Sequence, residues 1–268
     1  MRTRWSLSPQ HEEWLGSHIG PSSERVAKAV LALSDFYVKN HGEKTPWGRI
    51  ENSEMAYLSY FHPLNVLRLK AVLKETARFL RDSDFTEIWD FGSGAGAVHM
   101  ALEEQKQFLP KPLYCVEADA LARGLHQKWC SELKPRWSAE WRSGPTPSQG
   151  ALAVFSYSYL EMSGLNPPLK KFDHVLILEP SFQDTGRDLM KARQDWLEQG
   201  WTMLAPCPHQ KPCPLLTHSP RDWCHHRIHI ERPTCLEKLE RHLPMENRSL
   251  TYSYLLMTRS ASAAAAAI

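Results

Sequence analysis

The hydrophobic pattern of this chain changes near residue 86. Before that point, apolar residues recur with helical spacing, and they predict helices over residues 24–37 and 65–81. After it, short apolar runs alternate with amphipathic stretches. The most apolar run, Asp-His-Val-Leu-Ile-Leu-Glu at 173–179, has the composition of a central parallel strand, which is buried on both faces. The pattern therefore predicts an N-terminal helical region followed by an α/β core.

The core is predicted to be built on seven strands. We expect strands at residues 87–91, 113–117, 139–142, 151–156, 173–179, 200–205 and 251–258. We expect core helices at residues 95–106, 120–133, 188–198 and 236–242. Because strands that alternate with helices favour parallel pairing, the predicted fold class is α/β, with a mostly parallel, Rossmann-like sheet.

Composition narrows the classes of function. Lys plus Arg total 32 and Asp plus Glu total 30, so the net charge of +2 excludes a polycation, and any nucleic-acid contact must come from a local patch. No apolar run is long enough to cross a bilayer, and no secretory signal follows Met1. We expect a cytoplasmic protein of bacterial type, monomeric when free, without disulfides. Cys115 and Cys130 fall in a predicted strand and helix and are expected to be core residues.

A glycine-rich loop follows the first predicted core strand. The segment Trp-Asp-Phe-Gly-Ser-Gly-Ala-Gly contains Asp90, Gly92, Gly94 and Gly96. Glycines let the backbone turn sharply and approach a ligand closely, and the helix that follows offers free N–H groups at its N-terminus. Glu117 ends the next predicted strand, where a carboxylate can accept hydrogen bonds from both hydroxyls of a ribose. This pattern predicts a nucleoside-binding site.

Two nucleoside cofactors compete for this loop. Two of its glycines and Ala97 satisfy the dinucleotide fingerprint, whereas Asp90 and all three glycines match D-x-G-x-G-x-G, motif I of class I methyltransferases. Asp90 would repel a pyrophosphate, but S-adenosylmethionine has no phosphate and carries a cationic sulfonium and amine. We therefore favour S-adenosylmethionine over NAD. Tyr157, just after the fourth predicted strand, would border the same pocket.

Four cysteines gather in the C-terminal part of the chain. Cys207, Cys213, Cys224 and Cys235 are separated by five, ten and ten residues, and five histidines lie among them. The close C-x-x-C pairs of zinc fingers are absent, and Cys-Pro steps stiffen the loop, so an iron–sulfur cluster suits this spacing at least as well as zinc. A set of isolated buried thiols is the alternative. We predict a bound metal in this segment, with Cys235 and His209 as candidates for its fourth ligand.

Several motifs resemble the methyltransferase-like proteins of the mitochondrial small ribosomal subunit and their bacterial relatives. The similarity runs from about Tyr57 to Arg259. Its motifs are W-D-F-G-S-G-A-G at 89–96, S-Y-L-E at 158–161, L-E-P-S-F-Q-D-T-G at 178–186, Arg193, A-P-C-P-H…C-P-L at 205–215, D-W-C-H at 222–225 and Y-S-Y-L at 252–255.

The resemblance implies a class I methyltransferase fold that binds S-adenosylmethionine and carries a four-iron (4Fe-4S) cluster. By the same match, Cys207, Cys213 and Cys224 are cluster ligands. The family's last cysteine has no counterpart here, which leaves the fourth ligand to Cys235, to His209 or to neither. The implied segments are an N-terminal helical region 1–85, a cofactor-binding core 86–206, a Cys/His-rich cluster-binding insertion 207–235, a final helix and strand 236–259, and a low-complexity tail 260–268.

The implied function is methyl transfer to ribosomal RNA, or work in small-subunit assembly or translation. The partners would be the small ribosomal subunit and its RNA, without a membrane. One alternative is a non-catalytic assembly factor that uses the fold as an RNA-binding scaffold. Another is a methyltransferase that binds zinc and modifies a substrate other than RNA. The sequence singles out no catalytic residue.

Overall fold

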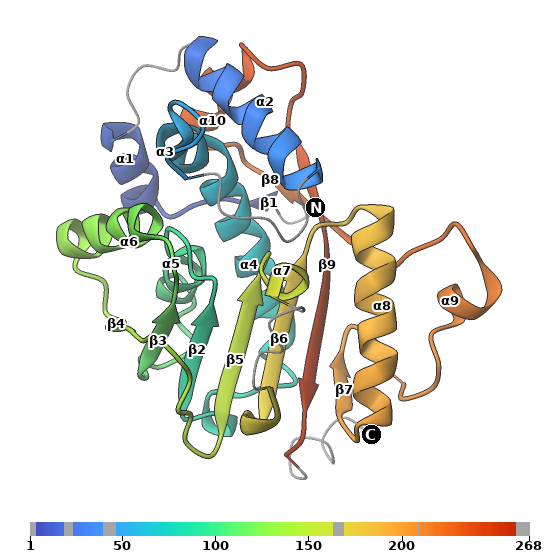
Figure 1. The fold of residues 1–268 in the computed structure, drawn as a ribbon. Coiled ribbons are helices and arrows are strands. Elements are labelled where there is room, and N and C mark those ends of the chain that lie inside the picture. The colour runs from blue at the N-terminus through green and yellow to red at the C-terminus, as the bar shows by residue number, and fades with distance from the viewer. Residues whose placement is uncertain (1–3, 19–23, 40–46, 163–168, 208, 261–268) are drawn as a thin grey trace.

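The computed structural model describes residues 4–18, 24–39, 47–162, 169–207 and 209–260. Within these ranges, nine strands form one sheet (Figure 1). The strands are β1 (Arg4–Trp5), β2 (Glu87–Phe91), β3 (Leu113–Val116), β4 (Ala139–Trp141), β5 (Ala151–Ser156), β6 (His174–Glu179), β7 (Thr202–Ala205), β8 (His226–Ile230) and β9 (Ser249–Thr258).

Helices surround this sheet and extend beyond one end of it. They are α1 (Pro9–His18), α2 (Glu24–Lys39), α3 (Ser53–Ala56), α4 (His62–Thr76), α5 (Ala97–Glu103), α6 (Ala120–Leu133), α7 (Tyr159–Met162), α8 (Gln183–Glu198), α9 (Pro214–His218) and α10 (Thr234–Glu240). A π-helical turn, Tyr57–Phe61, joins α3 to α4. None of the described helices combines the length and apolarity that a membrane-spanning helix needs.

The strand order defines where a ligand is expected. It runs β1-β8-β9-β6-β5-β2-β3-β4, and β7 pairs with the second half of β9. Strands β2 to β6 pair in parallel, whereas β9 is antiparallel to β6, β7 and β8. The chain order reverses beside β2, which lies between β3 and β5. In open α/β sheets, ligands bind outside the carboxyl ends of the strands at such a reversal. This confirms the predicted fold class and directs attention to the loops after β2 and β5.

Both faces of the sheet are buried, because alternate residues of each strand enter different hydrophobic clusters. In β2, Ile88 packs with α4 and α5 on one face, whereas Trp89 and Phe91 pack on the other with Leu189 and Trp196 of α8. Figure 1 shows α8 in front of β7 and β9, with α4 and α5 behind the sheet. This double burial explains why the core strands lack a polar face in the sequence.

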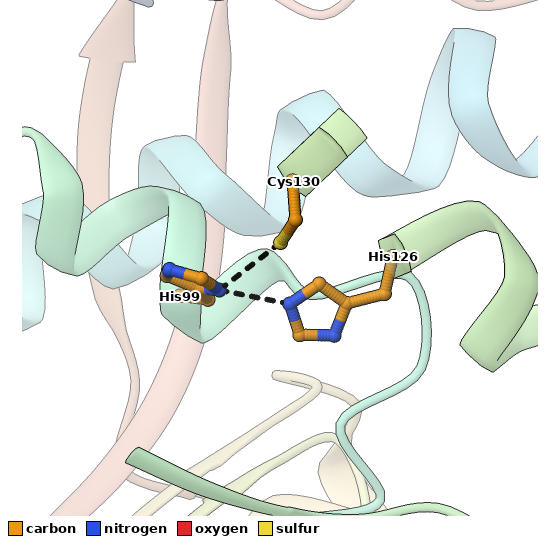
Figure 2. A group of neighbouring side chains, drawn as sticks. All are labelled: His99, His126 and Cys130. Atoms are coloured by element: carbon orange, nitrogen blue, oxygen red, sulfur yellow. Dashed lines mark hydrogen bonds between the residues drawn. The ribbon is translucent and has the colours of Figure 1, made fainter. Parts of the chain in front are cut away.

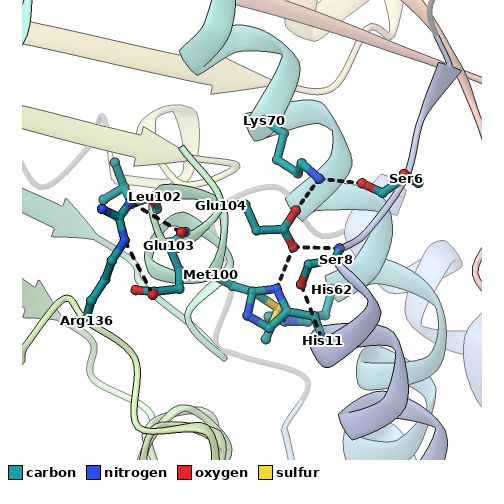
Figure 3. A network of polar contacts seen from close by, with 10 residues as sticks. All are labelled: Ser6, Ser8, His11, His62, Lys70, Met100, Leu102, Glu103, Glu104 and Arg136. Atoms are coloured by element: carbon teal, nitrogen blue, oxygen red, sulfur yellow. Dashed lines mark hydrogen bonds and ion pairs between the residues drawn. The ribbon is translucent and has the colours of Figure 1, made fainter. Parts of the chain in front are cut away.

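A buried ionic group ties the N-terminal segment to the core (Figure 3). The carboxylate of Glu104, directly after α5, pairs with Lys70 of α4 and lies 2.5 Å from Nδ1 of His11 in α1. It also accepts a hydrogen bond of 3.0 Å from the backbone N–H of Ser8. Burial alone would raise the pKa of Glu104, but the bonds from His11 and Lys70 lower it to about 2. The group is therefore ionised at neutral pH and links three segments of the chain.

The structure differs from the predicted organisation at the sheet edge. Strand β8 lies inside the segment 207–235 that was predicted as a separate cluster-binding insertion, and it pairs with both β9 and β1. The insertion is therefore partly a strand of the sheet. The hydrophobic pattern does not indicate β8, because three of its five residues are His or Arg and only Ile228 and Ile230 are apolar. Most of the predicted tail, residues 261–268, lies outside the described residues.

Candidate functional site

The glycine loop turns sharply between β2 and α5. Gly92, Gly94 and Gly96 all have positive φ angles, of 66°, 52° and 84°. L-residues with a side chain rarely adopt this conformation, so the loop depends on glycine. A Cβ atom on Gly94 would meet nothing closer than 3.6 Å, where the Tyr57 hydroxyl lies. The loop is therefore open at Gly94, and its backbone can be approached there by a ligand.

Asp90 is a fully buried carboxyl group beneath this loop. Neither of its oxygens has a hydrogen-bond partner within the described part of the chain. Burial, and secondarily the charge of Glu117, raises the pKa of Asp90 well above its usual range. A buried carboxyl without partners is costly, so its presence calls for a cationic or hydrogen-bonding ligand. This arrangement suits an amine or sulfonium and would disfavour a pyrophosphate.

Glu117 lies directly after β3 and faces the glycine loop. Its Oε2 accepts a hydrogen bond of 2.8 Å from the backbone N–H of Gly94, and its Oε1 accepts one of 2.8 Å from that of Asp119. Asp119 in turn caps α6 through the backbone N–H groups of Leu121 and Ala122. The Glu117 carboxylate is thus held at the reversal point of the sheet, half-buried beside the loop.

The loop after β5 lies beside the glycine loop, at the same end of the sheet. Tyr157 has a positive φ of 62°, and its half-buried side chain keeps a hydroxyl without a partner in the described chain. Burial raises the pKa of Tyr157 to about 12, so the hydroxyl stays protonated. Ser158 donates a hydrogen bond of 2.5 Å to the carbonyl of Phe91. A Cβ on Gly92 would approach Cβ of Ser158 to 2.6 Å, so this contact requires glycine.

Two further groups, Tyr57 and Glu179, lie near this edge of the sheet and were not singled out as site residues from the sequence. The Tyr57 hydroxyl has a raised pKa, chiefly through burial and then through the charge of Glu117. The charges of Glu161 and Asp90 raise the pKa of Tyr57 further, and a hydrogen bond with Asn65 opposes the increase. Glu179, at the end of β6, is buried with a pKa raised to about 8 by burial. Its position at a strand end was the available signal, and the family motif at 178–186 contains it.

A histidine pair lies against the other side of the loop (Figure 2). Nδ1 of His99 in α5 lies 2.9 Å from Nε2 of His126 in α6. A Cβ on Gly96 would come within 2.4 Å of the His126 ring, which explains the third glycine of the motif. Burial lowers the pKa of His99 to about 4 and also lowers that of His126, so both rings are neutral at neutral pH. Cys130, expected to be a core residue, is half-buried beside them.

Three of the four predicted metal-binding cysteines lie close enough to influence one another. Burial raises the pKa of Cys207, the Arg193 guanidinium opposes this increase, and Cys213 adds to it. Burial raises the pKa of Cys224 to about 11, with further contributions from Cys207 and Cys213. The structure therefore brings together the thiols of Cys207, Cys213 and Cys224, which are 17 residues apart at most along the chain.

Helix α8 supports the loops that carry these thiols. Arg193 is 1% exposed and donates hydrogen bonds to the carbonyls of His209 and Lys211, at 2.7 and 3.1 Å. Trp223 packs on Gly186, where a Cβ would come within 2.6 Å of its ring. The backbone N–H of Cys224 contacts the Met190 sulfur at 3.3 Å. These contacts hold both cysteine loops on one helix.

Cys235 lies apart from these three thiols. It is buried in α10, which packs against α1 and α2 and joins the hydrophobic cluster behind the sheet, whereas Cys207 packs against the opposite cluster. Burial raises the pKa of its thiol to about 11 and the backbone N–H of Leu236 opposes this increase, while the charged side chains that act on it are Glu12 and Lys238 rather than another cysteine. The structure thus does not bring Cys235 to the other cysteines. The reason is that the strand β8 carries the chain across the sheet edge between Cys224 and Cys235.

Several solved structures align with this chain. The 16S rRNA methylase ArmA aligns at a TM-score of 0.45 and 10% identity, over 85% of this chain and 97% of that one. The plantazolicin methyltransferase BpumL, bound to S-adenosylhomocysteine, aligns at a TM-score of 0.42 and 11% identity, over 87% and 100%. TrmK of M. capricolum, also bound to S-adenosylhomocysteine, aligns at 0.43 and 9%, over 70% and 68%. No curated protein sequence matches this chain.

A family model covers most of the chain. It matches residues 51–268, which include the glycine loop, the carboxyl groups around it and all three neighbouring thiols. Its description is "Mitochondrial small ribosomal subunit Rsm22". This chain belongs to the Rsm22 family.

Proposed function

We propose that this protein binds S-adenosylmethionine between the loops after β2 and β5 and methylates RNA of the small ribosomal subunit. The observation that carries the proposal is Asp90, a buried carboxyl group beneath three glycines of positive φ, whose two oxygens have no hydrogen-bond partner among the residues that the structure describes. Family membership supports the small subunit as the partner. When bound, S-adenosylmethionine supplies an electrophilic methyl group on a cationic sulfur.

The residues of the chain then have separate roles. Asp90 offers two oxygens to the cationic ligand, whose positive charge would favour the ionised form of a carboxyl group that burial otherwise keeps protonated. Glu117 is in reach of ribose hydroxyls beside the loop. Gly94 leaves room for close approach to the backbone. Tyr57 and Tyr157 enclose the pocket with protonated hydroxyls, which keeps bulk water away from the transfer. Methyl transfer needs little acid–base help, so positioning of the acceptor supplies most of the rate.

Isothermal titration calorimetry tests the binding step. S-adenosylmethionine should bind and NAD should not. Asp90→Asn should weaken binding by roughly tenfold to a hundredfold, because a hydrogen bond to a charged group is worth about 1.5–3 kcal/mol. Glu140→Gln, which changes an exposed carboxylate on β4, is the matched control and should bind normally. Absence of heat with S-adenosylmethionine, or equal affinity of the two variants, would contradict the proposal.

A second assay tests the substrate. Purified small ribosomal subunits are incubated with labelled S-adenosylmethionine and the protein, and label in the RNA is counted. Incorporation that Asp90→Asn abolishes would support catalysis. Co-sedimentation with the subunit without any incorporation would instead indicate a non-catalytic assembly factor.

We also propose that Cys207, Cys213 and Cys224 hold an iron–sulfur cluster. The residues fit such a group, because three thiols influence one another electrostatically and one buried guanidinium stands beside them. Their sulfur atoms do not form a close single-ion group among the described residues. We propose a fourth ligand other than Cys235, because Cys235 lies in α10 and packs in a different hydrophobic cluster from Cys207.

Anaerobic purification tests the cluster. Iron, sulfide and visible absorption should be present in the wild-type protein and lost in Cys213→Ser. Cys235→Ser, which changes an equally buried cysteine elsewhere, should retain them. Equal loss in both variants, or zinc in place of iron, would refute the assignment.

A further inference from the structure

A second group of metal-binding side chains lies outside both sites described so far. This group consists of His99, His126 and Cys130 (Figure 2). Each residue offers one ligand atom, and these three atoms lie within 4.8 Å of one another, which is close enough to hold a single metal ion. His126 and Cys130 are four residues apart on α6, so they share one helix face, and His99 comes from α5. Both histidines are fully buried.

The tautomer of His99 suits a metal ligand. Its Nε2 lies 3.0 Å from the carbonyl oxygen of Trp137, which can only accept a hydrogen bond. Nε2 therefore carries the proton, and Nδ1 directs a lone pair toward His126 and Cys130. Histidine ligands in metal sites commonly donate their other N–H to a backbone carbonyl in this way.

The distances are close to those of a tetrahedral zinc site. Nδ1 of His99 lies 2.9 Å from Nε2 of His126 and 3.6 Å from Sγ of Cys130. With zinc bonds to nitrogen and sulfur of about 2.0–2.1 and 2.3 Å, tetrahedral geometry requires about 3.3 Å between nitrogens and about 3.6 Å between nitrogen and sulfur. The histidine pair would need to widen by about 0.4 Å to admit the ion. Trp129 stacks on His126 with ring centroids 5.3 Å apart, which holds that ring in place.

The donor set selects the class of ion. Two imidazoles and a thiolate favour a late first-row cation, whereas magnesium and calcium require oxygen ligands. Zn²⁺ is the first choice because it accepts nitrogen and sulfur ligands in tetrahedral geometry and needs no redox partner. Cys130 is half-buried, so an ion can enter from its side, and the fourth position is left for water.

We propose that His99, His126 and Cys130 bind one Zn²⁺ ion that cross-links α5 to α6. Binding releases the proton of the Cys130 thiol to solvent, and the proton on His126 moves to Nδ1 so that Nε2 can coordinate. His126 packs on Gly96, and Nε1 of Trp129 donates a 3.0 Å hydrogen bond to the carbonyl of Ala95. The ion would therefore stabilise the glycine loop through these two contacts. The site does not depend on the proposed methyl transfer, since none of its ligands belongs to that pocket.

Zinc content of the full chain tests the proposal. Cys207→Ser, Cys213→Ser and Cys224→Ser are combined to remove the other thiol group, and the protein is stripped with a chelator and dialysed against Zn²⁺. About one zinc ion per chain should remain bound. Adding Cys130→Ser should abolish this binding, whereas adding Cys235→Ser should leave it intact. With Co²⁺ in place of zinc, a thiolate charge-transfer absorption should appear and depend on Cys130.

Two outcomes would overturn the proposal. One is a folded triple variant, judged by circular dichroism, that binds no zinc, which would make the group an ordinary hydrogen-bonded histidine pair. The other is zinc binding that persists unchanged in Cys130→Ser. If the triple variant fails to fold, single variants decide the question. Cys130→Ser must then bind about one zinc ion fewer than Cys235→Ser, and equal zinc content would refute the site.

Discussion

The contact between Gly96 and His126 allows a quantitative test of the glycine loop. Gly96→Ala adds a methyl group that would lie 2.4 Å from the His126 ring, at a φ of +84°. Gly200, after α8, has the same φ of +84° but nothing within 4 Å of an added Cβ. Gly200→Ala is therefore a matched control, because it should lose only the free energy that an alanine costs at a positive φ.

The expected magnitudes follow from these two geometries. A left-handed conformation costs an L-residue roughly 1–2 kcal/mol, so Gly200→Ala should lose about that much unfolding free energy. Gly96→Ala should lose a further 1–3 kcal/mol or so, because His126 is fully buried and cannot move aside without disturbing Trp129 and Trp141. Urea denaturation at neutral pH measures both losses, provided that the m-values are unchanged.

A double-mutant cycle identifies the cause. In a His126→Ala background the clash is absent, so Gly96→Ala should cost no more than Gly200→Ala. The reasoning fails if the two glycine variants are equally destabilised in the wild-type background. The proposed clash is also refuted if Gly96→Ala still loses more unfolding free energy than Gly200→Ala when the His126 ring is absent.

Two predictions concern pH. Glu104→Gln should lower the unfolding free energy at pH 7 by roughly 3 kcal/mol, because it removes the carboxylate that pairs with Lys70 and His11 in a largely buried network. The wild-type protein should lose this contribution as the pH falls from 4.5 towards the pKa of about 2, and a variant with wild-type stability at pH 7 would contradict the network. Burial raises the pKa of Glu179 from 4.5 to about 8, so its folded form holds a proton more tightly than the unfolded chain, and wild-type stability should fall as the pH rises through that interval. Glu179→Gln should remove this decline in denaturation experiments between pH 5 and about 8.5, and parallel pH profiles of the two proteins would show that Glu179 is not held neutral.

Local sequence predicted the core elements well. The strands at 87–91, 151–156 and 173–179 appear within one residue of the expected bounds, because double burial produces continuous apolar runs that are hard to mistake. The loop after β2 could likewise be predicted from the sequence, since positive φ angles favour glycine at fixed positions. Strand β8 was not predicted, because three of its five residues are His or Arg and it therefore has no such run.

The same contrast applies to the candidate sites. Asp90 and the three glycines could be singled out from a motif of seven residues, and Cys207, Cys213 and Cys224 from a short cysteine-rich stretch. Three features could not be predicted in this way. Asp90 has no hydrogen-bond partner in the part of the chain that the structure describes, Cys235 lies apart from the other three cysteines, and His99 meets His126 and Cys130.

The sequence alone thus determined which segments form helices and strands and where the chain turns, because side-chain periodicity and backbone preferences act over a few residues. Only the tertiary structure decided which faces meet. His99 and His126 are 27 residues apart on different helices, and their contact depends on how α5 and α6 pack around the glycine loop. Packing of that kind is set by the shape of the whole core, which no local pattern contains.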